Sequence, residues 1–138
     1  MKTFKLTIFL LGLLLVLVAC TGNEQKIEGG EAVKQTYVNI TAEEAKAIME
    51  SDAEYVIVDA RTPEEFSEGH ISGAVLIPYD EISEKAESIL TDKDKTILIY
   101  CRSGRRSKIA AEALLELGYT DIREFGGIID WKYEIVIP

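Results

Sequence analysis

Thr96-Ile97-Leu98-Ile99-Tyr100 runs without interruption into Cys101-Arg102-Ser103-Gly104-Arg105-Arg106-Ser107. The first five residues predict a strand, and their continuous apolarity is typical of a strand covered on both faces, as in a parallel sheet. A helix is predicted next, because apolar residues recur at helical spacing on one face: Ile109, Ala110, Ala113, Leu114 and Leu117. Gly118 fits the position just beyond its end. Residues 101–107 therefore follow the carboxyl end of a buried strand, where open α/β sheets bind ligands.

Strands and helices alternate on both sides of this segment. Strands are predicted at residues 37–40, 55–59 and 74–77 before it and at 121–125 after it. Thr41 and Thr62 each begin a capping box that starts a helix, and a third helix carries an apolar stripe from Ile82 to Leu90. Five strands separated by helices predict an α/β domain over residues 36–138, with a mostly parallel sheet and helices on both faces.

The net negative charge of the chain argues against a nucleic acid partner. The 138 residues include 15 Lys plus Arg and 24 Asp plus Glu, which gives a formal net charge of −9. A protein this acidic lacks the broad basic surface that draws proteins onto phosphate backbones. We therefore expect no nucleic acid partner, and we expect a monomer.

The amino terminus has the pattern of a secretory leader. Two lysines lie within residues 1–5, and residues 6–19 carry no charge. This apolar run is shorter than the roughly 20 residues of a membrane-spanning helix. It ends in Leu17-Val18-Ala19-Cys20, which resembles the bacterial lipobox. The resemblance implies that residues 1–19 are removed as a signal peptide and that Cys20 is lipidated. The protein would then be anchored to a membrane, outside the cytoplasm, in a bacterial cell envelope. The alternative is an uncleaved anchor with an incidental cysteine.

Residues 20–35 are polar and contain glycine, without a hydrophobic period, and we interpret them as a flexible tether. With Cys20 lipidated, Cys101 is the single remaining thiol of the chain. Extracytoplasmic compartments normally pair or eliminate free cysteines. We therefore expect Cys101 to have a chemical role.

The segment 101–107 has the composition of an anion-binding loop with a nucleophile. A cysteine between a strand and a helix faces backbone N–H groups and the positive end of the helix dipole, which both favour the thiolate. Arg102, Arg105 and Arg106 add cationic charge, and guanidinium groups suit oxyanions. The alternative interpretation is an inert buried cysteine beside solvated arginines. Cations at a helix amino terminus oppose its dipole, which favours an anionic ligand.

Three motifs together resemble the single-domain rhodanese family of sulfurtransferases. The family loop reads Cys-Arg-x-Gly-x-Arg or Thr, and Cys101, Arg102, Gly104 and Arg106 match it. The other two motifs lie at residues 58–74 and 126–131. The resemblance implies the family's three-layer fold and transfer of a sulfane sulfur from thiosulfate or a similar small anionic donor to cyanide or a thiol.

The resemblance also implies the site and the mechanism. Cys101 would be the catalytic nucleophile that attacks the outer sulfur of the donor and carries it as a persulfide. The substrate-binding residues would be the rest of the loop, through its N–H groups and its guanidinium groups: Arg102, Ser103, Gly104, Arg105, Arg106 and Ser107. No metal and no organic cofactor is required.

Other functions remain open from the sequence. Cysteine phosphatases and arsenate reductases of the same fold resemble the domain, but their loop is one residue longer, Cys-x5-Arg. A persulfide carrier that turns over little thiosulfate would keep the same loop. A non-catalytic binding module could use the same fold, although relatives of that kind lack the cysteine.

The remaining motif residues have structural interpretations. Arg61 is predicted to pair with Glu64 or Glu65 near a helix start. His70 is the single histidine, and we expect it to fix a turn by a hydrogen bond rather than act as a base. Trp131 and Phe125 are predicted to pack in the core.

Overall fold

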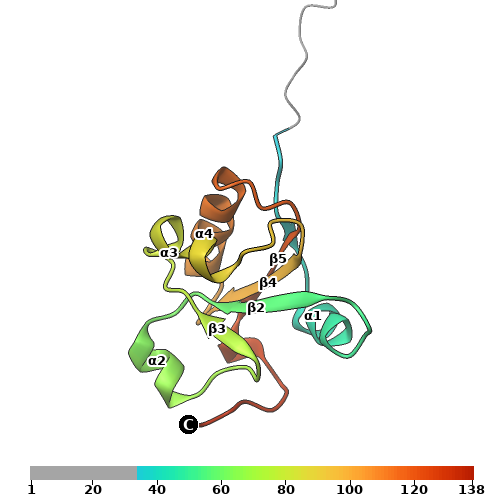
Figure 1. Ribbon diagram of the computed structural model, residues 1–138. Helices are drawn as coiled ribbons and strands as arrows, with labels where there is room; N and C mark the ends of the chain where they lie inside the picture. The colour runs from blue at the N-terminus through green and yellow to red at the C-terminus, as the bar shows by residue number, and fades with distance from the viewer. Residues whose placement is uncertain (1–33) are drawn as a thin grey trace, which may run out of the picture. The chain divides into compact units, whose positions relative to one another are not determined.

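The structure is a computed structural model that describes residues 34–138. The predicted signal peptide (1–19), the lipidation site Cys20 and the predicted tether up to residue 33 lie outside the described residues. Five strands and four α-helices alternate along the described part of the chain (Figure 1). Their order is β1 (Val38–Asn39), α1 (Ala42–Met49), β2 (Tyr55–Asp59), α2 (Pro63–Glu68), β3 (Ala74–Leu76), α3 (Ile82–Ile89), β4 (Thr96–Cys101), α4 (Arg105–Glu116) and β5 (Ile122–Gly127), followed by the 3-10 turn Ile128–Asp130.

The strands form one sheet in the order β1-β5-β4-β2-β3, and every neighbouring pair is parallel. The predicted α/β fold class is therefore confirmed. β4 lies in the middle of the sheet, so its last residue, Cys101, is at the centre of the carboxyl-terminal edge. This edge is where a parallel sheet leaves its loops free to bind a ligand.

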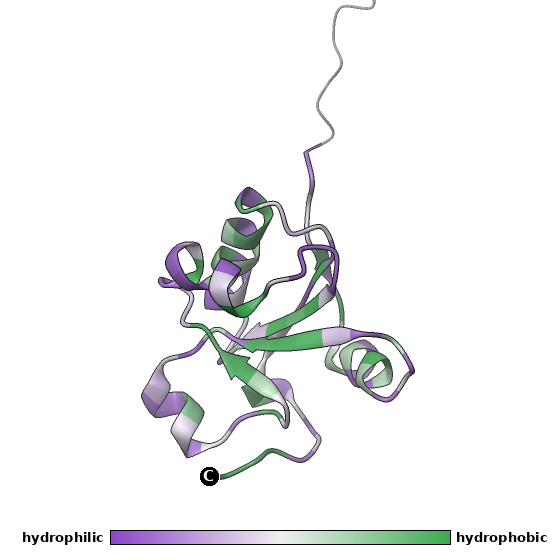
Figure 2. Ribbon diagram, in the orientation of Figure 1, coloured by the Kyte–Doolittle hydropathy of each residue, from purple (hydrophilic) through white to green (hydrophobic). Residues whose placement is uncertain are grey.

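Apolar side chains of β4 alternate between two cores. Ile97, Ile99 and Cys101 pack in the larger core beneath α3 and α4, whereas Leu98 and Tyr100 pack in the smaller core beneath α1. The period of two residues follows from strand geometry, and burial on both faces explains the continuous apolar run. Figure 2 shows the central strands as hydrophobic and the helices as mixed along their faces.

Helix starts agree with the capping signals. Thr41 and Thr62 both accept a hydrogen bond from the backbone N–H three residues later, and Glu44 and Glu65 close the two capping boxes. The predicted buried face of α4 is correct for Ala110 and Leu114, whereas Ile109 is 42% exposed and Ala111 is buried in its place. None of the helices between residues 34 and 138 is long and apolar enough to cross a membrane.

A bulge in β5 brings that strand against the loop after β4. Ile99 pairs with Glu124, but Cys101 pairs with Gly127, so β5 has one more residue than β4 across this interval. Gly126, within the bulge, has φ +87°, a left-handed conformation that glycine tolerates.

Candidate active site

The loop after β4 closes around the sulfur of Cys101. The residue is 1% exposed, and the N–H of Gly104 donates to its Sγ at 3.0 Å. The hydroxyl Oγ of Ser107, in the first turn of α4, lies 3.4 Å from the same sulfur. Gly104 and Ser107 both lie at the start of α4. The amino-terminal end of this helix therefore faces the sulfur, which is the arrangement predicted from the sequence.

Two opposing effects act on the acidity of this thiol. Burial raises the pKa of Cys101, because a buried thiolate is poorly solvated. Hydrogen bonds from the Ser107 hydroxyl and from the backbone N–H groups of Ser107, Ser103 and Gly104 lower the pKa and outweigh the burial. The net pKa lies below the usual value of a cysteine, so the site favours the thiolate, which is the nucleophilic form.

Two glycines let the backbone approach the loop. Gly104 has φ +96°, which favours glycine at the turn into α4. Gly127 lies so close to the loop that a Cβ there would be 2.1 Å from the carbonyl oxygen of Arg102. Only a residue without a side chain fits at position 127, and β5 thereby forms one wall of the loop.

The three arginines of the loop are placed differently. Arg102 and Arg105 are exposed to solvent. Arg106 is partly buried, and its two terminal nitrogens donate to the two carboxylate oxygens of Glu65 at 2.7 and 2.8 Å. Glu65 is at the start of α2, so this bidentate pair ties α2 to the loop after β4. The sequence did not single out Glu65 for this role.

The predicted pairing of Arg61 is wrong. Its guanidinium group binds the buried carboxylate of Asp59 and the carbonyl oxygen of Gly69. Burial, and secondly the charge of the nearby Asp59 carboxylate, raise the pKa of Tyr100. The phenol therefore stays protonated and donates a hydrogen bond to Asp59. Arg61 therefore belongs to a buried network with Asp59 and Tyr100. Asp59 is only two residues from Arg61 in the sequence, and Glu65 is already paired with Arg106.

His70 and the two aromatic residues have the expected structural roles. The ring of His70 stacks on Phe66 at 3.7 Å, and its Nδ1 lies 3.0 Å from the carbonyl oxygen of Phe66. Its backbone pairs with Val136 near the carboxyl terminus. Phe125 is buried and contacts both Tyr100 and the partly buried Trp131.

Glu124 is a further residue of the site that the sequence does not predict. This residue is 2% exposed, and its Oε1 accepts hydrogen bonds from the Ser107 hydroxyl at 2.6 Å and from the N–H of Gly126 at 2.9 Å. It lies on β5 directly behind the loop. A glutamate in a short strand before two glycines gives no sequence signal for burial, because glutamate is usually exposed.

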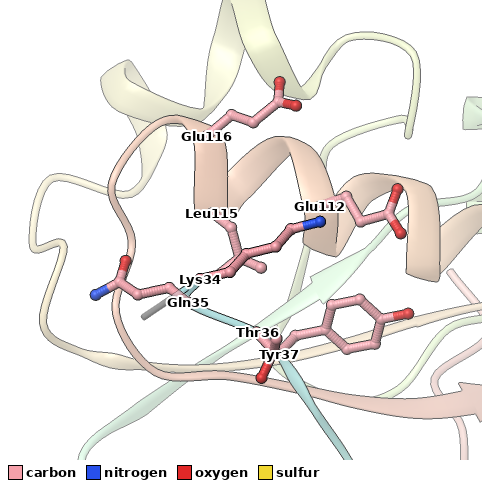
Figure 3. Close-up of a pocket in the computed structure, with 7 residues that line it drawn as sticks. All are labelled: Lys34, Gln35, Thr36, Tyr37, Glu112, Leu115 and Glu116. Carbon is pink, nitrogen blue, oxygen red and sulfur yellow. The ribbon is translucent and has the colours of Figure 1, made fainter. Parts of the chain in front are cut away.

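Two surface pockets lie elsewhere on the domain. The larger has a volume of about 670 Å³ and is lined by residues 34–37 and the exposed side of α4 (Figure 3). The second has a volume of about 540 Å³ and lies beside Tyr55 and Trp131. Neither contains a residue of the loop, and no cluster suited to a metal ion occurs among residues 34–138.

Comparison with known sequences supports the resemblance. A sequence model of the Rhodanese-like domain matches residues 41–134. The thiosulfate sulfurtransferase PspE of Escherichia coli (strain K12) is 40% identical over 73 residues, which cover 53% of this chain and 70% of PspE. A sulfurtransferase of Allochromatium vinosum is 40% identical over 77 residues, covering 55% of this chain and 70% of that protein.

Solved structures have the same fold. A rhodanese with anions from E. coli is 36% identical with a TM-score of 0.57, covering 61% of this chain and 99% of that chain. A rhodanese-related protein from Thermoplasma volcanium is 32% identical with a TM-score of 0.64, covering 74% of this chain and 100% of that one.

Proposed function

This chain belongs to the rhodanese-like domain family, and on that premise we propose that it transfers a sulfane sulfur through a persulfide on Cys101. The donor is thiosulfate or a similar small anion, and the acceptor is cyanide or a thiol. The observation that carries the proposal is the buried Cys101 sulfur, which accepts a hydrogen bond from Gly104 and has a lowered pKa. A relative named thiosulfate sulfurtransferase supports the choice of donor.

The proposed reaction has two steps. In the first, the Cys101 thiolate attacks the outer sulfur of thiosulfate, a new S–S bond forms, and the old S–S bond breaks to release sulfite. In the second, cyanide attacks the outer sulfur of the persulfide, and thiocyanate leaves while the thiolate is restored. A covalent intermediate divides one difficult transfer into two easier ones.

The loop supplies the electrostatic stabilisation in this mechanism. In the proposed intermediate, the backbone N–H groups of Ser103, Gly104 and Ser107, which contact the sulfur of Cys101, would hold the negative charge of the persulfide. Arg102 and Arg105, exposed at the rim, attract the anionic donor, while Arg106 holds a fixed charge beside Cys101. A related rhodanese from E. coli was solved with anions, which supports an anionic ligand for this chain as well.

Mass spectrometry of the full chain after incubation with thiosulfate tests the proposal. We expect a gain of one sulfur atom, located at Cys101 by peptide mapping, and its loss on adding cyanide. The Cys101→Ser variant should gain no sulfur and form no thiocyanate, while circular dichroism shows an unchanged fold. Sulfur gained by the serine variant, or no gain by the native chain, would contradict the mechanism.

We also propose that the protein is a lipoprotein anchored through Cys20 and exposed outside the cytoplasm. The support is the basic and apolar leader that ends in Leu17-Val18-Ala19-Cys20. A lipid anchor would keep the domain at a membrane surface, where it meets donors in the surrounding medium.

A further inference from the structure

The surface pocket beside Tyr55 and Trp131 has a lining that the proposed sulfur transfer does not use. It lies between α1, the start of β2 and the segment that follows the 3-10 turn, and its volume is about 540 Å³. Two nearly fully buried side chains of the smaller core, Ile57 and Ile71, form part of its lining. A cavity of this volume with an apolar lining can hold a small molecule. We call it the aromatic pocket.

Three aromatic side chains line the aromatic pocket: Tyr55, Trp131 and Tyr133. The rings of Trp131 and Tyr133 meet edge to face, with their centroids 4.9 Å apart. The hydroxyl of Tyr55 donates to the carbonyl oxygen of Met49 at 3.0 Å. The indole N–H of Trp131 donates to the carbonyl oxygen of Glu134 at 3.3 Å. Because backbone carbonyls already hold these two polar groups, the rings offer a ligand their apolar surfaces and their π-electrons.

A lysine of the chain shows which charge these rings attract. The ammonium nitrogen of Lys46 lies over the ring of Tyr133, 5.6 Å from its centroid, which is within the range of a cation–π contact. The hydrogen bond to Glu50 is the main cause that raises the pKa of Lys46, so this side chain is a cation at neutral pH. Within residues 34–138 no such contact reaches Tyr55 or Trp131. These two rings are therefore available to a second cation.

The carboxylate of Glu134 adds a negative charge to the same lining. Glu134 is exposed, and no ion pair joins it to a lysine or arginine within residues 34–138. The two lysines that line the pocket are paired with other carboxylates: Lys46 with Glu50 and Lys132 with Glu43. The net charge of −9 on the chain also attracts positive ions. These charges favour a positively charged ligand over a negatively charged one.

We propose that the aromatic pocket binds an organic ammonium ion that has an apolar body. The charged nitrogen lies against the rings of Tyr55 and Trp131 and near the carboxylate of Glu134, where cation–π and Coulomb attraction act together. The apolar body covers Ile57 and Ile71 and is thereby removed from water. No residue of the loop after β4 lines this pocket, so the inference does not depend on the proposed sulfur transfer.

The fluorescence of Trp131 tests the proposal, because Trp131 is the single tryptophan of the chain and lines the pocket. The full chain is titrated with benzyltrimethylammonium and, in parallel, with benzenesulfonate, which carries a similar ring and the opposite charge. We expect a saturable change with the cation, at lower concentrations than any change with the anion. Tighter binding of benzenesulfonate would show an anion site and overturn the proposal, as would the absence of a saturable response to the cation.

A pair of charge variants tests the carboxylate. Glu134→Gln should weaken binding of benzyltrimethylammonium by about twofold or more, because an exposed carboxylate contributes modestly. Glu116→Gln removes the same charge from an exposed carboxylate in the other pocket (Figure 3) and should leave the Kd unchanged. Equal effects of the two variants would show that only the general charge of the chain attracts the cation, and would contradict a site at Glu134.

Two further variants test the rings and the resident lysine. Lys46→Met should tighten binding of the cation and weaken binding of benzenesulfonate, because it removes the competing positive charge beside Tyr133. Tyr55→Leu keeps an apolar wall without π-electrons and should weaken cation binding about two- to fivefold. Circular dichroism shows whether the leucine variant is folded. If it is not, Lys46→Met decides, since an unchanged or weaker affinity for the cation in that variant would overturn the proposal.

Discussion

Arg105 and Arg106 are neighbours in the loop, yet their side chains have different surroundings. Arg105 is exposed, whereas both terminal nitrogens of Arg106 bind Glu65 and its charge acts on Cys101. Arg106 therefore has one fixed position relative to the sulfur. No ion pair to a residue between 34 and 138 holds the Arg105 side chain in one place.

We expect Arg106→Ala to reduce kcat/KM for thiosulfate much more than Arg105→Ala. Loss of a positioned, charge-assisted contact costs about 1.5 to 3 kcal/mol, or roughly ten- to over a hundredfold, whereas loss of a solvated charge costs well under about 1 kcal/mol. The measurement is kcat/KM of both variants at low and at high salt. If both variants lost kcat/KM equally and both losses disappeared in high salt, the arginines would act only through their general positive charge. That result would contradict a specific role of Arg106.

At the scale of single residues, the sequence predicts the nucleophile and its loop but not the partners of the charged side chains. Cys101 is predicted as the nucleophile because it follows a buried strand and matches a short motif. The pair of Arg106 with Glu65 joins positions 41 residues apart, and the contact of Ser107 with Glu124 joins positions 17 apart. Such contacts depend on how β5 and α2 pack, which local patterns do not encode.

The strand β5 and the catalytic loop depend on each other through two adjacent glycines. Gly126 has a left-handed backbone with no atom within 4 Å of an added Cβ, whereas Gly127 has ordinary dihedrals but faces the carbonyl of Arg102. A side chain at position 126 would therefore strain the backbone without a clash, whereas a side chain at position 127 would clash with the loop without backbone strain.

We expect Gly127→Ala to displace the loop and abolish most sulfur transfer, because an added methyl group would overlap backbone atoms at 2.1 Å. Gly126→Ala should cost about 1 to 2 kcal/mol in stability for its backbone conformation and retain more activity. Thermal unfolding and thiocyanate formation, measured for both variants, separate these effects. Similar activities in the two variants would contradict the wall formed by Gly127.

The link between α2 and the loop should depend on pH. The hydrogen bond from Arg106 lowers the pKa of Glu65 from 4.5 to about 2 in the folded protein. The stabilisation is therefore fully present above pH 4.5 and is lost as the pH falls toward 2. Because Glu65 is partly exposed, we expect no more than about 2 kcal/mol.

Urea unfolding of the native chain and of Glu65→Gln between pH 6 and roughly pH 3 tests this expectation. The native chain should lose more stability than the variant as the pH falls. Parallel curves for the two proteins would show that the carboxylate of Glu65 does not contribute through its charge.

At the scale of elements, sequence patterns located all five strands and four helices of the described chain, because capping boxes, glycines and apolar periods coincide at their ends. The buried face of α4 was misjudged by one residue. The buried stripe consists of Ser107, Ala110, Ala111 and Leu114, which recur at helical spacing, and Ile109 lies off this stripe. The bulge of β5 has no sequence signal apart from Gly126.

For the whole molecule, the proposed lipid anchor gives a prediction that does not involve the domain. Cys20→Ala should move the protein from the membrane fraction to the soluble fraction, because once the leader is removed residues 21–35 are polar and offer no apolar stretch to hold the membrane. Cell fractionation with immunodetection measures the change. An inhibitor of lipoprotein signal peptidase is an independent check, since it should yield a larger precursor; an unchanged size would contradict the lipobox interpretation.

The nearly complete burial of Cys101 has a consequence for the kinds of molecule that can react with it. A reagent reaches this sulfur only through the opening of the loop, so its reaction rate should depend on its width near the reacting atom more than on its oxidising strength. We expect narrow reagents such as cyanide and thiosulfate to react with Cys101 much faster than a disulfide on the surface of a folded protein. This steric selection would give the lone thiol kinetic protection from mixed disulfides, so that a single cysteine could persist in an oxidising compartment without a partner.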